Sequence, residues 1–353
     1  MSHRFLASIG ALAVVIVVVS VTPVSVSGQS PARKTPAGAK TWTPPRTPWG
    51  EPDLQGVWDF ATITPLERPR ELAGKQVLTE EEAANFEVEQ NRRENRDLID
   101  PKTGGSIYPP GAVIPYNEFW YDRGTKVIGS RRTSLIVDPP DGRIPPLTPE
   151  ARRREDARTA VQREDQLPGG HPRADSWEDR SVTDRCILGF NSGPPMVPGA
   201  YNNIVQLLQS PGYVVILNEM IHSARIVRLD GRPHLAQQYI RQWVGDSVGH
   251  WEGSTLVVDT ANFYRETSFR GSSANMHLVE RFTRVAEDAI GYEFTVDDPT
   301  TWTRPWTAAF PMTKTQGQLY EYACHEGNYA LKGILAGARA QEKAAEQAET
   351  RKQ

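Results

Sequence analysis

The 353-residue chain has only two cysteines, no concentrated run of basic residues and no fingerprint of a nucleotide site. Its 40 Lys and Arg and its 43 Asp and Glu are mixed along the sequence and leave a formal net charge of −3. Proteins that bind nucleic acids usually gather basic side chains along the phosphate backbone. We therefore expect no nucleic-acid partner, and the lack of a Walker or Gly-x-Gly-x-x-Gly sequence argues against a nucleotide cofactor.

Histidine is scarce as well, and none of the seven has the His-x-x-x-His or His-x-His spacing of a zinc site. A metal site would need residues from distant parts of the chain to converge, so the sequence assigns none. Ser192 precedes a glycine but lacks the Gly-x-Ser-x-Gly elbow of a serine hydrolase. The need for any cofactor stays unknown at this point.

Long apolar runs are limited to the N-terminus, where residues 5–21 are the one segment apolar enough to enter a membrane. Arg4 precedes this run, Pro23 interrupts it, and the small residues Ser27 and Gly28 follow. This layout is typical of a secretory signal peptide. We expect residues 1–28 to be cleaved and the mature protein to be periplasmic or secreted, without a membrane partner. The alternative is an uncleaved anchor, because the run is nearly long enough to span a bilayer.

Whether the two cysteines, Cys186 and Cys324, form a disulfide depends on the compartment of the protein. An oxidising compartment favours joining a lone pair of cysteines in a disulfide, which is the pairing that we predict. Two separately buried thiols are the alternative, and a cysteine nucleophile is less favoured.

Proline and glycine, with 28 residues each, indicate many turns and loops rather than long helices. Residues 29–49 are Pro-rich and polar, and we interpret them as a disordered linker. Loops rich in Pro and Gly should form a layer with helices over residues 61–200. Residues 336–353, rich in Ala, Glu and Lys, should be a helical or disordered tail.

Three elements are expected before the main run of strands. Residues 54–60 have the composition of a first strand. A helix should follow Thr79, because Glu82 lies three residues later and completes a capping box. A second helix should begin after Thr148, with proline in its first turn.

From residue 213 onward the sequence changes to about eight strand-like runs with tight turns between them. The runs are residues 213–229, 234–245, 248–252, 255–263, 276–285, 290–296, 305–314 and 319–324. The turns are expected at Asp230-Gly231, Gly253-Ser254, Glu287-Asp288 and Asp298-Pro299. Antiparallel meanders commonly close into barrels, because closure removes exposed edges.

The predicted fold class is therefore mainly β. We expect one antiparallel meander that closes into a lipocalin-like barrel, with two or three peripheral helices and long loops. A single barrel-like domain should occupy residues 50–335.

Four motifs resemble a large group of exported proteins from environmental bacteria that have no assigned activity. They are DGRPH at 230–234, GHWEGSTLVVDTANF at 249–263, MHLVERFTRV at 276–285 and DDPTTWTRPW at 297–306. The likeness covers about residues 48–340 and implies membership of an uncharacterised family, without a reaction or catalytic residues to transfer.

A weaker resemblance is to the lipocalin-like, or calycin, barrels. It rests on a Gly-x-Trp sequence at Gly56 and Trp58, in an early strand that precedes a meander. The chain departs from the lipocalin pattern in the roughly 150 residues that separate Trp58 from the meander. This departure puts a simple eight-stranded barrel in doubt.

The stretch ILNEMIHSARIVRLDGRPH, residues 216–234, carries polar side chains in the middle of an apolar run. On one continuous strand, Asn218 and His222 would share one face while Glu219 and Arg225 shared the other. A helical interpretation is the alternative, because Glu-x-x-His occurs in the metal sites of four-helix bundles. Such bundles need paired copies of the motif, and this chain has one.

These residues supply the predicted catalytic set. His222 is the candidate base, Glu219 or another carboxylate would orient it, and Arg225 or Arg241 would receive negative charge. The candidate ligand-binding residues are Asn218, Tyr239, Asp259, His277 and Glu280.

Tyr239 would lie opposite His222 if Asp230 and Gly231 form a two-residue turn. The carboxylates have a second explanation, because buried acids must pair or become protonated. Glu–Arg pairs inside a barrel, and histidines that are only hydrogen-bonded in the core or at the rim, therefore stay open as alternatives.

Two functions follow from this set. The first is an enzyme, a hydrolase or a lyase, that uses histidine and carboxylate acid–base chemistry on a small organic or carbohydrate-derived molecule in a ligand cavity. The second is a non-catalytic periplasmic carrier whose cavity holds an apolar small molecule. A structural envelope protein is a third option.

Overall fold

The computed structural model describes residues 42–95, 97, 117–164, 166–167, 171–172, 174–236 and 240–351. The expected signal peptide, nearly all of the linker and Tyr239 lie outside the described residues. Residues Thr43–Gln353 form one unit. No helix in the described part of the chain is long and apolar enough to cross a membrane.

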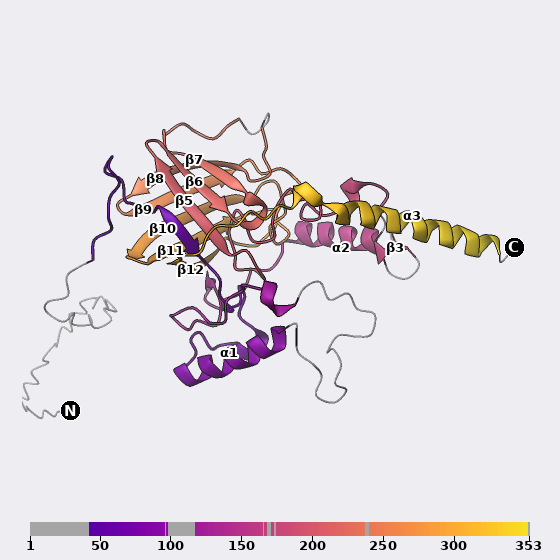
Figure 1. The fold of residues 1–353 in the computed structure, drawn as a ribbon, viewed down its shortest axis with the longest axis horizontal. Helices are drawn as coiled ribbons and strands as arrows, with labels where there is room; N and C mark the ends of the chain where they lie inside the picture. The colour runs from indigo at the N-terminus through magenta and orange to yellow at the C-terminus, as the bar shows by residue number, and fades with distance from the viewer. Residues whose placement is uncertain are drawn as a thin grey trace, which may run out of the picture. The chain divides into compact units, whose positions relative to one another are not determined.

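Among the described residues, nine strands close into a barrel (Figure 1). In order around it they are β1 Gly56–Asp59, β5 Ile204–Ser210, β6 Tyr213–Asn218, β7 Ala224–Arg228, β8 Asp246–Glu252, β9 Thr255–Ala261, β10 His277–Ala286, β11 Ala289–Asp297 and β12 Trp306–Lys314. The ring closes where Trp58 of β1 lies opposite Lys314 of β12. The short β2, Ile136–Asp138, also pairs with β12. The predicted mainly β barrel is confirmed.

Alternating burial explains the strands of the second half. In β10 and β11 nearly every second residue is buried and its neighbours are half-buried, as expected when one face of a sheet covers a core. The interior is filled by aromatic rings. Phe282 and Tyr292 have ring centroids 4.9 Å apart, and Phe294 and Trp306 are 5.7 Å apart. Each fully buried large apolar side chain contributes about 1.5–3 kcal/mol to folding.

The expected strand at 213–229 is two strands, so the placement of His222 in mid-strand is wrong. Strand β6 ends at Asn218, and a 3-10 turn at Met220–His222 leads into β7. The Asn218 N–H donates to the Ser223 carbonyl at 2.9 Å, which closes the hairpin. Ile221 has a left-handed φ of 59°. The turn contains neither Gly nor Pro, and the turn-favouring residues at its ends are Asn218 and Ser223.

The hairpin expected at Asp230-Gly231 is also wrong. Strand β8 runs parallel to β7, and Arg228 lies opposite Val248. Residues 234–245 hold no strand in their described part, 234–236 and 240–245. At this junction a Cβ on Gly249 would lie 2.8 Å from a methyl carbon of Val227. The close approach of the two strands therefore requires glycine.

Two further expectations differ from the structure. Residues 319–324 form no strand. Strand β5 was not expected, because it follows a segment rich in Pro and Gly, yet it joins β1 to β6 in the sheet. Burial in β5 alternates, which is the pattern of a strand with one covered face.

Helices lie outside the barrel (Figure 1). They are α1 Glu80–Glu94, α2 Pro149–Glu164 and α3 Tyr329–Thr350, with 3-10 turns η1 Arg70–Leu72, η2 Glu118–Trp120, η3 Trp177–Asp179, η4 Met220–His222 and η5 His325–Gly327. A two-stranded ribbon is formed by β3 Gln166–Leu167 and β4 His171–Pro172. The capping box of Thr79 and Glu82 is confirmed.

The predicted disulfide is confirmed. Cys186 and Cys324 are joined, with Cα atoms 5.6 Å apart. The bond ties the loop that precedes β5 to the segment that leads into α3.

Candidate functional site

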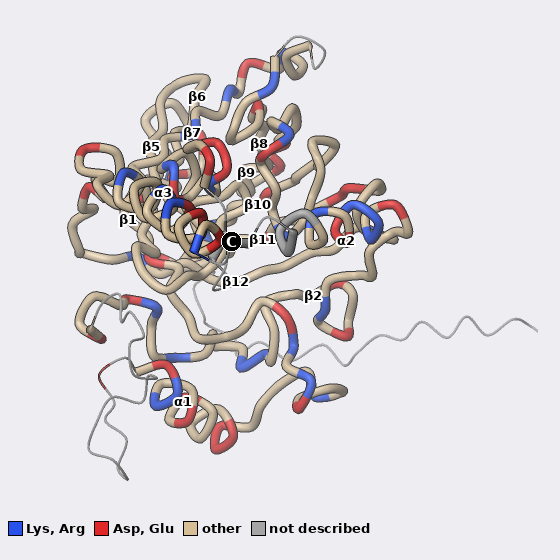
Figure 2. Tube along the Cα trace, turned by 90° about the vertical axis from the view of Figure 1, so that its right-hand side faces the viewer, with Lys and Arg blue, Asp and Glu red and all other residues tan. Residues whose placement is uncertain are grey.

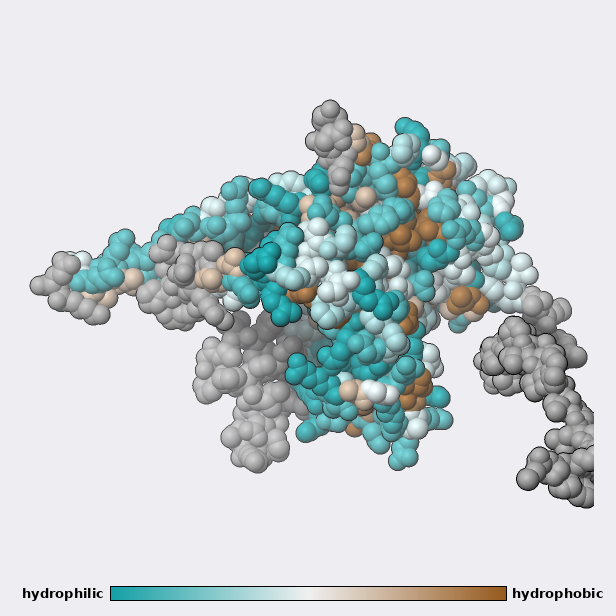
Figure 3. All heavy atoms as spheres, turned by 180° about the vertical axis from the view of Figure 1, so that it is seen from behind, coloured by the Kyte–Doolittle hydropathy of each residue, from teal (hydrophilic) through white to brown (hydrophobic). Residues whose placement is uncertain are grey.

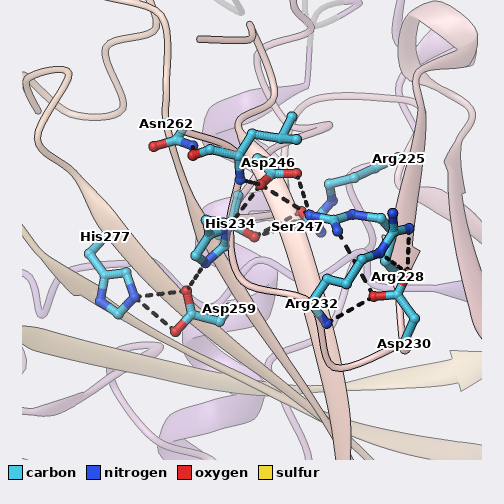
Figure 4. Close-up of polar contacts among 12 residues, drawn as sticks. Arg225, Arg228, Asp230, Arg232, His234, Asp246, Ser247, Asp259, Asn262 and His277 are labelled. Atoms are coloured by element: carbon cyan, nitrogen blue, oxygen red, sulfur yellow. Dashed lines mark hydrogen bonds and ion pairs between the residues drawn. The ribbon is translucent and has the colours of Figure 1, made fainter. Parts of the chain in front are cut away.

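Two carboxylates and two imidazoles alternate along a chain of hydrogen bonds beside strands β8, β9 and β10 (Figure 4). His234 Nδ1 lies 3.1 Å from Asp246 Oδ2, and His234 Nε2 lies 2.8 Å from Asp259 Oδ1. His277 Nε2 lies 2.9 Å from each oxygen of Asp259. We call Asp246, His234, Asp259 and His277 the His–Asp array.

Strand register brings the array together. Asp259 lies opposite Val248 of β8 and Val279 of β10. Its neighbours Val258 and Thr260 are fully buried in the barrel, so Asp259 points to the outer face. Asp246 begins β8 and His277 begins β10, while His234 comes from the loop after β7.

Exposure rises steadily from one end of the array to the other. The side chain of Asp246 is 6% exposed, that of His234 26% and that of Asp259 33%. The side chain of His277 is 46% exposed. The array therefore has an inner end at Asp246 and an outer end at His277, where a small molecule could reach the ring.

Further hydrogen bonds fix the inner end. Arg228 donates to Asp246 Oδ1 at 3.1 Å, and the backbone N–H of Leu235 donates to Asp246 Oδ2 at 2.8 Å. The side chain of Asn262 donates to the Leu235 carbonyl at 2.7 Å. The loop that carries His234 is therefore held against β8 and β9.

The electrostatics of the array favour ionised carboxylates and make His277 a stronger base. Burial opposes ionisation of Asp259, but hydrogen bonds from His277 and His234 outweigh it and lower the pKa of Asp259. Burial likewise opposes ionisation of Asp246, and the bonds from Leu235, His234 and Arg228 outweigh it and lower its pKa. The hydrogen bond to Asp259 raises the pKa of His277 against the opposing effect of burial.

His234 has a carboxylate at each ring nitrogen. These two contacts hold its ring between β8 and β9. His234 therefore links the two carboxylates of the array.

The structure separates the members of the predicted catalytic set. His222 is exposed, and its Nδ1 lies 3.3 Å from the Tyr322 carbonyl oxygen. Glu219 is buried and accepts a hydrogen bond from the Tyr320 N–H at 3.1 Å. Arg241 donates to the carbonyl oxygens of Phe263 and Ala274.

Burial raises the pKa of Glu219, and two other acids add to the effect. Asp122 and Asp59 raise it further by repulsion, and burial raises the pKa of each of them as well. Because Asp59, Asp122 and Glu219 are far apart in the sequence, their mutual influence could not be predicted from it.

Arg225 and Glu280 lie inside the barrel and form a buried ion pair. Arg225 donates to both oxygens of Glu280, and the distance from its second terminal nitrogen to Oε1 is 2.9 Å. Tyr292 donates to the same carboxylate at 2.7 Å. These contacts match the alternative of Glu–Arg pairs inside a barrel. Asn218 is also buried, and its side-chain oxygen has no partner among the described residues.

Of the predicted ligand-binding residues, the structure brings Asp259 and His277 together. Their partners His234 and Asp246 are not among the residues that the sequence proposes. A signal was nevertheless present, because three of the motifs quoted above contribute one member each. DGRPH ends in His234, GHWEGSTLVVDTANF contains Asp259, and MHLVERFTRV contains His277.

Possible metal ligands converge elsewhere. Within the described residues, ligand atoms of His222, Glu321 and Glu326 lie within 4.8 Å of one another, and all three side chains are exposed. Carboxylate oxygens and an imidazole can bind divalent ions, but exposed acidic groups also gather on ordinary polar surfaces.

Comparison with known proteins assigns no family. No family model matches the chain, and no curated protein or solved structure matches it significantly. The closed barrel agrees with the weaker likeness to lipocalin-like barrels, although it has nine strands in the described part of the chain. Membership of the exported family stays a prediction.

Proposed function

We propose that the protein is an exported acid–base enzyme, a hydrolase or lyase that acts on a small organic molecule at the His277 end of the His–Asp array. The observation that carries this proposal is the hydrogen bonding of His277. Its Nε2 is held by Asp259, and no group in the described part of the chain bonds its Nδ1. An imidazole oriented in this way through one nitrogen can exchange a proton through the other.

Each member of the array has a role in this proposal. Asp259 orients His277 and stabilises the imidazolium that forms when Nδ1 takes a proton from the substrate or from a water molecule. His234 fixes Asp259 from the other side, and Asp246 holds His234. Asp259, His234 and Asp246 are therefore positioning residues, and His277 is the group that would touch the substrate.

The choice of His277 as base replaces His222 in the proposed mechanism. Among the described residues, the ring of His222 has one hydrogen bond, to a backbone carbonyl, and no carboxylate is hydrogen-bonded to it. Arg225 is engaged with Glu280 inside the barrel. The disulfide agrees with the export part of the proposal, because such bonds persist in oxidising compartments.

The alternative function, a carrier that holds an apolar molecule inside the barrel, has less support. An apolar ligand inside the barrel would have to displace the packed rings of Phe282, Tyr292, Phe294 and Trp306, all of which are buried. Interiors packed to this density have no spare volume for a ligand.

Turnover of a substrate panel tests the proposal. The full chain is assayed against chromogenic esters, lactones and substrates that undergo β-elimination, together with His277→Gln and Asp259→Asn. We expect kcat/KM to fall by about 10² or more in His277→Gln, because a positioned base contributes that much. His250→Gln is the matched control, since His250 is exposed and bonded to Glu252 outside the array. Full turnover by His277→Gln, or an equal loss in the control, would refute the assignment.

A further inference from the structure

A second feature of the molecule is a cavity of about 890 Å³ beside α2. Its walls come from α2, from loop residues 144–147 and 180–182, and from residues 265–272. Ligand pockets in proteins commonly have volumes of about 300–1,000 Å³. The cavity is therefore large enough for a small organic molecule.

Arginine is concentrated around this cavity, although the whole chain has a net negative charge. The lining includes Arg154, Arg158, Arg180, Arg265 and Arg270, against the acids Glu67, Glu155 and Glu266. The lining thus has two more positive than negative side chains. Figure 2 shows that basic and acidic residues both occur along α2.

The arginines differ in how far they are already neutralised. Arg154 is bonded to Glu150, and Arg180 is bonded to Asp184. Arg158, Arg265 and Arg270 have no hydrogen bond or ion pair from their side chains within the described residues. Glu266 is engaged by Arg185, which is not part of the lining. Three guanidinium groups are therefore available to a ligand.

Apolar side chains line the same cavity. They include Ile144, Leu147, Ala151, Val182 and Trp302, and Trp302 is almost fully buried. A small inorganic anion would leave this apolar surface uncovered. An arginine set beside an apolar floor matches a molecule with an anionic head and an apolar body.

We propose that this cavity binds an organic oxyanion, a carboxylate, sulfonate or phosphate group carried on an apolar body. Arg158, Arg265 and Arg270 bind the anionic head, and Ile144 with Leu147 contacts the body. The proposal does not depend on the His–Asp array. The two features are nevertheless linked by sequence, because residues 265–272 belong to the segment between β9 and β10, which carry Asp259 and His277.

The test uses a fluorescent anion of this chemistry, 8-anilinonaphthalene-1-sulfonate, and its uncharged counterpart N-phenyl-1-naphthylamine. Binding to the full chain is measured by fluorescence titration and by calorimetry. We expect one sulfonate site per chain and binding of the uncharged compound at least about tenfold weaker, since charged hydrogen bonds are lost. Equal binding of both compounds, or no binding of the anion, would overturn the proposal.

Variants locate the site, because Figure 3 shows other apolar residues over the barrel to which the probe could adhere. The double variant Arg158→Gln with Arg265→Gln should weaken sulfonate binding by about tenfold or more. The matched control is Arg152→Gln with Arg153→Gln, which removes the same charge from exposed positions of α2 outside the cavity. The control should bind as the wild type does.

Two further outcomes are decisive. If both double variants lose binding equally, the effect is one of net charge and the site is not in this cavity. If inorganic phosphate displaces the probe as effectively as benzenesulfonate does, the apolar floor has no role and the proposal fails. Melting temperatures confirm that each variant is folded, and the single variant Arg158→Gln replaces the double variant if the latter does not fold.

Discussion

Arg225 and Glu280, 55 residues apart in the sequence, form a two-pronged ion pair inside the closed barrel. Burial disfavours the charge of Arg225, yet Glu280 outweighs burial and raises the pKa of Arg225. Burial and the nearby carboxylate raise the pKa of Tyr292 well above its ordinary value, so its hydroxyl stays a donor. The pair joins β7 to β10 across the interior.

Removing one partner of this ion pair should destabilise the fold strongly. We expect Glu280→Ala to lower the free energy of unfolding by about 3–5 kcal/mol, because an isolated charge is left in the core. Urea unfolding followed by tryptophan fluorescence measures the change. The double variant Arg225→Met with Glu280→Leu is the control, and it should recover most of the loss. A cost below about 1 kcal/mol for Glu280→Ala would show that water reaches Arg225.

The His–Asp array should make stability depend on pH. Because the folded-state pKa of His277 is raised, its stabilising contribution is complete below about pH 6.5 and is lost as pH rises through the folded value. The pKa values of Asp259 and Asp246 are lowered, so their contributions are present above about pH 4 and are lost as pH falls through the folded values. The array should therefore stabilise the fold most between these limits.

The difference between wild type and His277→Gln isolates the contribution of His277. Urea midpoints at about pH 5.5 and about pH 8.5 should differ more for the wild type than for the variant. Asp59, Asp122 and Glu219 also titrate, but they do so in both proteins. An identical pH profile for the two proteins would mean that His277 is not coupled to Asp259 in solution.

The disulfide should contribute measurably to stability. Replacing Cys186 and Cys324 together by Ala should lower the free energy of unfolding by about 2–5 kcal/mol, because the unfolded chain gains freedom over a separation of 138 residues. Thermal unfolding of wild type with and without a reductant provides the same comparison without a mutation. Two alkylated thiols in protein isolated under non-reducing conditions would contradict the bond itself.

A separate prediction concerns cleavage of the signal peptide. The mature chain should begin near Gln29, because the small residues before it suit a signal peptidase. N-terminal sequencing of protein recovered from the periplasm or the medium tests this. Recovery only in the membrane fraction with Met1 retained would favour an uncleaved anchor.

Strands with clear alternation and explicit turns could be predicted from the sequence. Glycine or acidic residues mark turns beside β9, β10 and β11, and in β11 every second side chain is apolar and buried. The reversal after Asn218 could not be predicted, because its left-handed residue is the β-branched Ile221 rather than glycine. Because of this turn, the residues after it do not keep the alternation expected for one continuous strand. His222 lies in the turn itself, and Arg225 is buried inside the barrel.

The candidate site was harder to predict for a different reason. His234, Asp259 and His277 are distant in sequence and meet only through the register of β9 and β10 and through a loop that returns from β7. Strand periodicity says which face a residue occupies, but it does not say which loop covers that face. Asp246 carried no signal of its own, because its role depends on Arg228 and on the backbone of Leu235.

Closure of the barrel by β1 and β12 constrains how the molecule can fold. Trp58 pairs with Lys314, so the first strand finds one of its two neighbours only after almost the whole domain has been made. Contacts between residues so far apart in sequence slow folding, because the entropy of closing the chain is lost before the contacts form. The barrel therefore cannot close until β12 has been synthesised, so the finished fold is reached only near the end of synthesis.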